Sequence, residues 1–416
     1  MLKVSPPRKN RILDQALIRR AWTTIRRAQL HRSYRARREW YARAASDANF
    51  RYDESHIAAK VAERLALRGF ATQPRARGQI HSFAFIPRVG WHESLLPDLC
   101  ELGPVTEFNY VSLGYTIDEF VTGAAARRRD MNSLLLKAVI EAHRRRPIDW
   151  VFMYSTGGEI LASTVHAIAQ EIGVPVVNMC LDDKHSWETE RVGEQRGGQI
   201  DIASAFDLSW TSARVACEWY LVEGGNPLYL PEGFDATTFH PQDVPRDIAV
   251  SFVGGAYGFR PSVIETLRRA RVPVRSFGEG WGGGRLTIEE VVSVFNRSEI
   301  NLGMGGIGYS QDLTNLKGRD FEIPGCGGGV YLTSFNPDLA EHFVIGKEIL
   351  CYRNTDDLVE LSRWFIKHSD EARSIALRAR IRCLEEHRWL NRYLRVCEIL
   401  GILAPDPKLS GFHSPQ

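Results

Sequence analysis

The stretch IAVSFVGGAYGFRPSVIETLRRARVPVRSF, residues 248–277, contains the alternation that decides the fold. An apolar run at 248–253 predicts a buried strand, and a second run at 273–277 predicts another. Between them, Pro261 suits the first position of a helix, where a missing backbone N–H costs nothing. A strand, a helix and a strand in this order predict a parallel sheet with helices on its faces.

The same alternation extends through most of the chain. Before this stretch, strands are predicted at 80–86, 150–154, 175–181, 206–210 and 228–230, with helices at 94–102, 131–144, 159–172 and 213–223. After it, Thr287 and Glu290 have the spacing of a capping box at the start of a helix. Strands at 299–302 and 330–333 and helices at 355–368, 370–385 and 387–400 follow. Two such series predict two Rossmann-like domains facing a cleft.

The bulk composition is that of a folded protein with two cores. The chain has 416 residues, of which 44% are hydrophobic and 25% are charged. No run approaches the roughly 20 apolar residues that a membrane span needs, and the N-terminus lacks the apolar segment of a secretory signal. We therefore expect a cytoplasmic protein, with peripheral attachment to the inner membrane face as an alternative. The cysteines form no CxxC pair, which predicts free thiols.

The first fifty residues are strongly basic. Asp14, Glu39 and Asp47 are the only acidic residues among many arginines. Residues 12–46 contain no glycine or proline and have apolar residues at helical spacing, so one long helix is predicted, followed by another at 55–67. Two interpretations stay open: a helix packed on the domain behind it, or an arm that binds an acidic partner or an anionic membrane surface. No pattern indicates a specific nucleic-acid partner.

These patterns divide the chain into four parts. They are a basic helical extension, a first Rossmann-like domain, a second Rossmann-like domain, and a helix that crosses back to the first domain with a tail: 1–78, 79–243, 244–385 and 386–416. Ligands of open α/β sheets bind at the carboxyl ends of the strands, so the loops there are the places to look for a site.

Several loops of the second domain are rich in glycine. They are GGAYGFR (254–260), GEGWGGGR (278–285), GMGGIG (303–308) and GCGGG (325–329). Glycine lets backbone amides approach an anion, and helix N-termini add partial positive charge, so these loops favour a phosphate. None matches a Walker A loop or a dinucleotide-binding GxGxxG turn, and tight turns explain the glycines equally well.

The segment LKGRDFEIPGCGGGVYLTS (316–334) adds charged side chains to such a backbone. Arg319 offers a planar fork for phosphate oxygens and Lys317 a mobile point charge, so the pair suits a diphosphate. Glu322 can accept hydrogen bonds from two neighbouring hydroxyls, such as those of a ribose. The alternative interpretation is a solvated salt-bridge cluster.

Residues 313–392 resemble the C-terminal domain of the spore-maturation-protein-like (CgeB-type) glycosyltransferases, of the wider GT-B group 1 class. The resemblance continues upstream through VSFVGGAYGFR, FGEGW and SEINLG, and through 209–241 before the interdomain linker. It implies the GT-B fold, which is α/β with two Rossmann-like parallel-sheet domains facing a cleft, here with an N-terminal helical extension. It also implies transfer of a sugar from a nucleotide-diphosphate sugar to a glycan, protein or small-molecule acceptor, with this co-substrate and no further cofactor.

The resemblance also assigns roles to individual residues. It places Glu322 at the glutamate that holds the nucleotide ribose, and Gly327 in the small-residue stretch that follows. The diphosphate-binding positions fall on Lys317, Arg319, Gly254, Gly255 and Arg260. The family's other glutamate, which contacts the donor sugar, falls on Thr314. The donor sugar and the stereochemical outcome therefore stay open.

Candidates for a catalytic base follow the strands of the first domain. His92 and Glu93 begin the helix after the first strand. The segment LDDKHSWE (181–188) places Asp183 and His185 after another strand. An inverting transferase needs such a base beside the acceptor hydroxyl, and we favour Asp183 over Glu93. Helix caps and solvated loops are the structural alternatives for these residues.

Two further patterns concern ligands of this domain. The segment STGGE (155–159) could present the amides of Gly157 and Gly158 to a ligand. Adjacent Asp182 and Asp183 suggest a metal-binding pair, but GT-B enzymes generally neutralise the diphosphate with protein cations. We therefore predict no metal.

Two other functions are compatible with these residues. One is a catalytically silent nucleotide-binding scaffold, which the threonine at position 314 allows. The other is a GT-B-shaped nucleotide-sugar epimerase.

Overall fold

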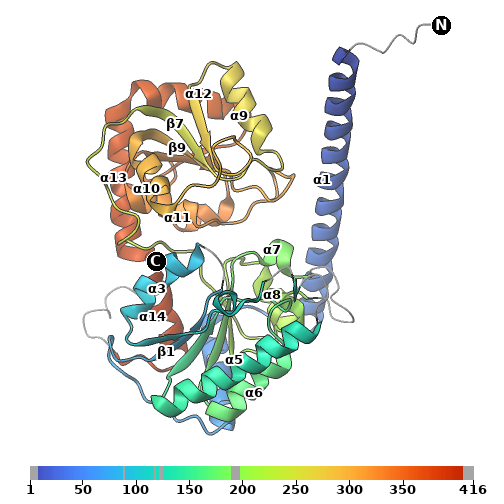
Figure 1. The fold of residues 1–416 in the computed structure, drawn as a ribbon, viewed down its shortest axis with the longest axis vertical. Helices are drawn as coiled ribbons and strands as arrows, with labels where there is room; N and C mark the ends of the chain where they lie inside the picture. Colours follow the sequence, from blue (N-terminus) through green and yellow to red (C-terminus); the bar gives the residue numbers. More distant parts are fainter. Residues whose placement is uncertain (1–7, 88–89, 117–118, 121–124, 189–196, 406–416) are drawn as a thin grey trace, which may run out of the picture.

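The computed structural model describes residues 8–87, 90–116, 119–120, 125–188 and 197–405. It contains two separate sheets, each flanked by helices, with a long helix along one side (Figure 1). A search of the described helices finds none with the length and apolar character needed to cross a membrane.

The first sheet has the order β2-β1-β3-β4-β5-β6, and all its pairings are parallel. Its strands are β1 (Ser82–Phe85), β2 (Val105–Glu107), β3 (Trp150–Met153), β4 (Val176–Cys180), β5 (Leu208–Thr211) and β6 (Pro227–Tyr229). Its helices are α3 (Trp91–Cys100), α5 (Ala125–Arg145), α6 (Ala162–Ile172), α7 (Asp183–Ser186) and α8 (Ala216–Val222). Successive residues of β3 enter opposite cores, Val151 on one face and Phe152 on the other, so this strand is apolar throughout.

The second sheet has the order β11-β10-β9-β7-β8 and is also parallel. Its strands are β7 (Ile248–Val253), β8 (Val274–Phe277), β9 (Ser298–Leu302), β10 (Val330–Ser334) and β11 (Leu350–Tyr352). Its helices are α9 (Arg260–Arg269), α10 (Ile288–Arg297), α11 (Arg319–Cys326), α12 (Thr355–Lys367) and α13 (Ser369–Glu386). The predicted capping box is confirmed, because Thr287 caps α10 and Glu290 bonds back to it.

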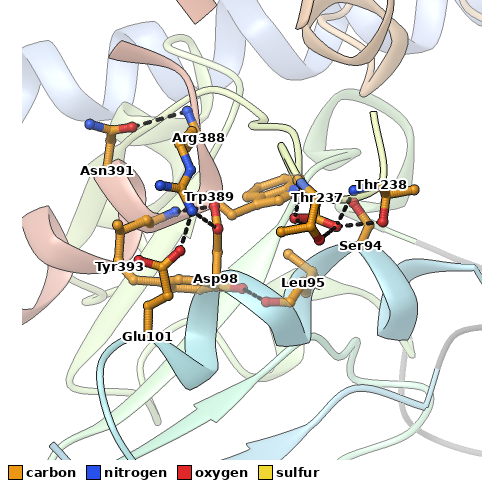
Figure 2. A network of polar contacts seen from close by, with 12 residues as sticks. Ser94, Leu95, Asp98, Glu101, Thr237, Thr238, Arg388, Trp389, Asn391 and Tyr393 are labelled. Atoms are coloured by element: carbon orange, nitrogen blue, oxygen red, sulfur yellow. Dashed lines mark hydrogen bonds and ion pairs between the residues drawn. The ribbon is translucent and has the colours of Figure 1, made fainter. Parts of the chain in front are cut away.

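The last helix, α14 (Trp389–Ile399), lies against the first domain. Trp389 Nε1 donates to Ser94 Oγ at 3.1 Å, and Tyr393 OH donates to the Leu95 carbonyl at 3.1 Å (Figure 2). Arg388, just before the helix, pairs with both Asp98 and Glu101. The first domain is therefore built from two separate parts of the chain.

Helices α1 (Arg8–Asp47) and α2 (Glu54–Leu67) precede the first sheet. Tyr41 near the end of α1 is 2% exposed and stacks on Trp219 with 5.7 Å between ring centroids. Its hydroxyl donates to Glu223 at 2.7 Å and accepts from Trp187 Nε1 at 2.8 Å. This end of α1 is packed on the first domain, and Figure 1 shows the rest of the helix running alongside the second.

Some elements differ from the sequence predictions. The edge strands β2 and β11 were not predicted; each has three residues and, unlike the equally short β6, is not buried throughout. The helix expected from 159 begins at Ala162 instead. The buried Glu159 side chain accepts hydrogen bonds from Tyr110 and Thr156, which holds residues 156–160 in a turn. The boundary predicted near 244 falls between β6 and β7.

Candidate functional site

The order of the second sheet reverses beside β7, because β8 follows on one side and β9 on the other. The loops after β7 and β9 therefore border the crevice in which such sheets bind ligands. Gly258 in the first loop has φ 62°, and a Cβ there would collide with the carbonyl oxygen of Gly308 in the second. Glycine at 258 thus lets the two loops pack backbone against backbone.

Two arginines converge on Gly254 at the end of β7. A Cβ on Gly254 would lie 3.3 Å from Arg319 Nη1 and 3.4 Å from Arg260 Nη1. Within the described parts of the chain, neither guanidinium forms an ion pair with a carboxylate. Two cations held together in this way favour an anion between or beside them.

Arg260 is the more buried of the two, with 3% of its surface exposed. Its Nη1 donates to the Gly255 carbonyl at 3.3 Å, and its guanidinium lies 4.1 Å from the centroid of Tyr257. Burial, and then the charge of Arg319, lower the pKa of Arg260 to about 10. An anion bound here would relieve the repulsion between the two arginines.

Glu322 lies in the first turn of α11, three residues after Arg319. A Cβ on Gly318 would lie 3.1 Å from Glu322 Oε1 and 3.4 Å from the ring of Trp91, so this carboxylate lies near the first domain. Burial raises the pKa of Glu322 to about 7, and the Arg319 charge opposes that rise. The site therefore combines cations with a carboxyl group that ionises near neutral pH.

Lys317 lies across the interface between the domains from Asp182. The distance from Lys317 Nζ to Asp182 Oδ1 is 3.1 Å. Close by, Asn315 Nδ2 donates to the Leu181 carbonyl at 2.8 Å. The loop after β4 thus contacts the segment before α11 directly.

A second lysine, this one from the first domain, also contacts the opposite domain. Lys184 Nζ donates to the Thr314 carbonyl at 2.9 Å and lies 3.2 Å from Asp338 Oδ2. The Thr314 hydroxyl donates to Asn336 at 3.2 Å, so the position expected to contact the donor sugar is engaged within the second domain. The two domains are closed on each other here.

The predicted donor-binding residues are only partly gathered in one place. Gly254, Gly255, Arg260 and Arg319 come together, with Glu322 one helical turn away. Gly327 ends α11 in the left-handed conformation with φ 69°, and a Cβ there would lie 2.6 Å from the Arg380 side chain. It therefore lets α13 approach, at the opposite end of α11 from Arg319.

The favoured base, Asp183, lies inside the first domain. It has no exposed surface, and its two oxygens accept hydrogen bonds from Thr211 Oγ1 at 2.5 Å and from Tyr220 OH at 2.9 Å. Burial raises its pKa to about 6. This geometry is that of a structural carboxylate that fixes α7, and it does not support a role as the base.

His185 is placed differently, at the surface between two hollows. One is a cavity of about 70 Å³ at the ends of β3 and β4, lined by Asp182, His185, Thr156, Gln199 and their neighbours. The other is a pocket of about 530 Å³ that His185 shares with Lys317 and Tyr257. His185 Nδ1 lies 3.8 Å from Asp182 Oδ1. Of the predicted bases, His185 is the one that borders both hollows.

The remaining first-domain candidates have local partners. His92 Nε2 lies 2.6 Å from Glu107 Oε2, and Glu93 is exposed in the first turn of α3. Neither lines the two hollows just described. The Gly157 amide donates to the Gly198 carbonyl at 3.2 Å, so it serves the fold rather than a ligand.

Two features of the site were not predicted. Arg26, Gln29, Leu30 and Ser33 of α1 line the larger pocket, a contact across more than 100 residues of sequence that no local pattern encodes. Glu232 is 2% exposed, its Oε2 has no hydrogen-bond partner among the described residues, and burial raises its pKa to about 8. The described residues include no group of three His, Cys, Asp or Glu side chains placed to hold a metal ion.

Residues 260–398 match a family model described as glycosyl transferase-like. The matched region begins at Arg260 and includes Arg319, Glu322 and the returning helix α14. No curated protein matches the chain.

Several solved structures are similar in fold. HepE from Anabaena in complex with UDP and glucose aligns with a TM-score of 0.54 at 12% identity, over 78% of this chain and 99% of that one. Its complex with UDP-glucose aligns with a TM-score of 0.52 at 11% identity, over 76% and 98%. Sucrose-phosphate synthase from Thermosynechococcus elongatus aligns with a TM-score of 0.50 at 12% identity, over 77% of this chain and 87% of that one. The predicted GT-B fold is confirmed.

Proposed function

We propose that this protein is a glycosyltransferase that moves a sugar from a nucleotide-diphosphate donor to an acceptor. The observation that carries this proposal is the convergence of Arg260 and Arg319 on Gly254, at the switch point of the second sheet. Burying cations without a counter-ion is costly, and a diphosphate would supply the missing negative charge. The family-model match over residues 260–398 and the UDP-glucose complex of HepE support this donor class.

The donor would bind across the first turn of α11. Arg260 and Arg319 would bind the diphosphate, and the N-terminus of α11 adds partial positive charge. Glu322 would accept hydrogen bonds from the ribose hydroxyls. Negative charge builds on the diphosphate as the sugar departs, so the same two arginines would stabilise the transition state. This proposal needs no metal.

The acceptor would approach from the first domain. Its hydroxyl oxygen forms a bond to the anomeric carbon while the bond from that carbon to the diphosphate oxygen breaks. In an inverting reaction the hydroxyl proton passes to a protein base, for which we propose His185 in place of Asp183. In a retaining reaction the departing diphosphate oxygen takes the proton.

The finer identity rests on the resemblance to the CgeB-type enzymes, which we retain as a proposal. Thr314 stands where those enzymes are expected to have a glutamate, so the donor sugar would be held differently here.

Calorimetry with UDP and UDP-glucose, followed by an assay for free UDP with and without a mixture of candidate acceptor sugars, tests the function. We expect micromolar to millimolar binding of both nucleotides and UDP release that depends on an acceptor. Absence of nucleotide binding would overturn the proposal. Binding without turnover would identify a scaffold, and sugar isomerisation without acceptor would identify an epimerase.

A further inference from the structure

The long helix α1 forms a wall of the larger pocket. The pocket, of about 530 Å³, is lined by Arg26, Gln29, Leu30 and Ser33 from α1, and on its other sides by His185 of the first domain and by Lys317, Tyr257 and residues 306–309 of the second. Three separate parts of the chain thus border one open pocket. Its volume falls within the range of pockets that bind small molecules.

Helix α1 is fixed to both domains around this pocket. On the second domain, Arg27 pairs with Asp312, and His31 Nε2 lies 2.6 Å from Ser310 Oγ. On the first domain, Arg37 Nη1 donates to the Lys184 carbonyl at 3.2 Å. The lining residues of α1 therefore have defined positions relative to both domains.

The pocket adjoins the proposed diphosphate site. Tyr257 lines the pocket and also packs on the guanidinium of Arg260, 4.1 Å from its ring centroid. His185, our proposed base, lines the same pocket. A molecule in the pocket would therefore lie close to both the proposed diphosphate site and the base, as an acceptor must.

The chemistry of the lining suits an acidic sugar. Tyr257 and Tyr309 offer aromatic faces, and Gln29 and Ser33 offer hydrogen-bonding groups suited to hydroxyls. Arg26 and Lys317 supply positive charge, and the lining residues include no aspartate or glutamate. Lys317 also forms an ion pair with Asp182.

We propose that this pocket is the acceptor site, that α1 forms one wall of it, and that Arg26 selects an acceptor sugar bearing an acidic group. This inference rests on the proposed function. The guanidinium recognises a carboxylate and a phosphate by the same charge-assisted hydrogen bonds, so either group fits the geometry. The N-terminal helix is on this view part of the substrate site as well as part of the fold.

Saturation-transfer NMR on the full chain with UDP present tests the inference. The probes are methyl β-D-glucuronide, glucose 6-phosphate and the neutral methyl β-D-glucoside. We expect at least one acidic sugar to bind, and the glucoside to bind at least about tenfold more weakly. The replacement Arg26→Ala should weaken the binding of the acidic sugar by a similar factor. The control Arg32→Ala removes the same charge from an exposed position of α1 outside the pocket lining and should change nothing.

Each contrary result overturns the inference. These results are no binding of either acidic sugar, equal binding of the glucoside, an unchanged affinity in Arg26→Ala, or an equal loss in Arg32→Ala. Calorimetry with UDP, GDP and dTDP on the same samples separates the two proposals. Normal UDP binding with no sugar binding rejects the acceptor pocket alone, whereas absent binding of UDP, GDP and dTDP rejects the glycosyltransferase function.

Discussion

Lys317 Nζ lies 3.1 Å from Asp182 Oδ1, so a cation expected to bind the donor is paired with a carboxylate of the opposite domain. The pair is partly exposed, and such pairs contribute little to stability, from about 0 to 1 kcal/mol. A diphosphate entering the cleft can therefore compete with Asp182 for Lys317 at low cost.

Replacing Asp182 by asparagine should tighten donor binding. The substitution leaves Lys317 without its carboxylate partner, so its charge becomes available to the diphosphate. We expect the affinity for UDP-glucose, measured by calorimetry, to rise by up to about fivefold. The control Asp338→Asn breaks a different interdomain ion pair, that of Lys184, and should leave the affinity unchanged. A weaker affinity in Asp182→Asn would show that Lys317 does not bind the donor.

Replacing Arg319 by alanine should weaken donor binding strongly. A lost charge-assisted hydrogen bond to phosphate costs about 1.5 to 3 kcal/mol, which corresponds to about a tenfold to hundredfold loss of UDP affinity. The control Arg268→Ala removes an exposed arginine from the last turn of α9, at the opposite end of that helix from Arg260. Equal affinities in the two variants would remove Arg319 from the proposed diphosphate site.

Donor affinity should increase as the pH rises toward and beyond neutrality. The pKa of Glu322 is raised to about 7, so below that pH its carboxyl is protonated and accepts ribose hydrogen bonds less well. Calorimetry with UDP-glucose from about pH 6 to about pH 8 should show this rise, because this donor has no phosphate group that titrates there. The variant Glu322→Gln should bind more weakly and lose the dependence. A flat profile in the unmodified protein would contradict the ribose role.

The same raised pKa has an opposite effect on folding. Between the ordinary carboxyl pKa and about pH 7, the folded state holds a proton on Glu322 that the unfolded state has released. Glu322 therefore reduces the free energy of unfolding as the pH rises through this window. Denaturant titrations of the unmodified protein and of Glu322→Gln should diverge there, with the unmodified protein losing more stability on the alkaline side.

Asp183 should matter for stability and not for proton transfer. The replacement Asp183→Ala removes the acceptor for both Thr211 and Tyr220, which leaves buried hydroxyls unsatisfied. We expect a loss of about 2 to 4 kcal/mol in the free energy of unfolding, measured with urea. Asp183→Asn should be milder, and folded molecules of it should keep their turnover. A properly folded Asp183→Asn protein without turnover would restore Asp183 as a candidate base.

Tyr41 should be required for the docking of α1. The change Tyr41→Phe keeps the ring stacked on Trp219 but leaves the indole N–H of Trp187 without its acceptor. We expect a loss of about 1 to 3 kcal/mol of stability, with faster proteolytic cleavage within α1. Trp40→Phe, at a half-exposed neighbouring position, is the control and should have little effect. Equal effects would mean that the hydroxyl does not fix the helix.

The fold was predictable because parallel strands buried on both faces give uninterrupted apolar runs. The position of individual side chains relative to the cleft between the domains was harder to predict. Asp182 and Asp183 are adjacent, yet Asp182 contacts the second domain and Asp183 is buried in the first. The sequence pattern does not determine where β4 ends and α7 begins, and the directions of the two side chains depend on that boundary.

The contribution of α1 to the pocket could not be predicted for a different reason. Its helical character is local and was clear, whereas its docking depends on Tyr41 meeting Trp187 and Trp219, well over a hundred residues away. The basic composition of the first fifty residues left open a packed helix or an arm for an acidic partner, and an acidic sugar in the pocket is our proposal for such a partner.

The return of α14 to the first domain constrains the order in which the chain folds during synthesis. Trp389 and Tyr393 fill the core beside Trp210, so this domain lacks part of its interior until the ribosome has translated almost the entire sequence. The second domain, complete in one continuous segment, can form earlier. On the ribosome, the first domain is thus synthesised first and completed last. It must stay protected from aggregation while the second domain folds.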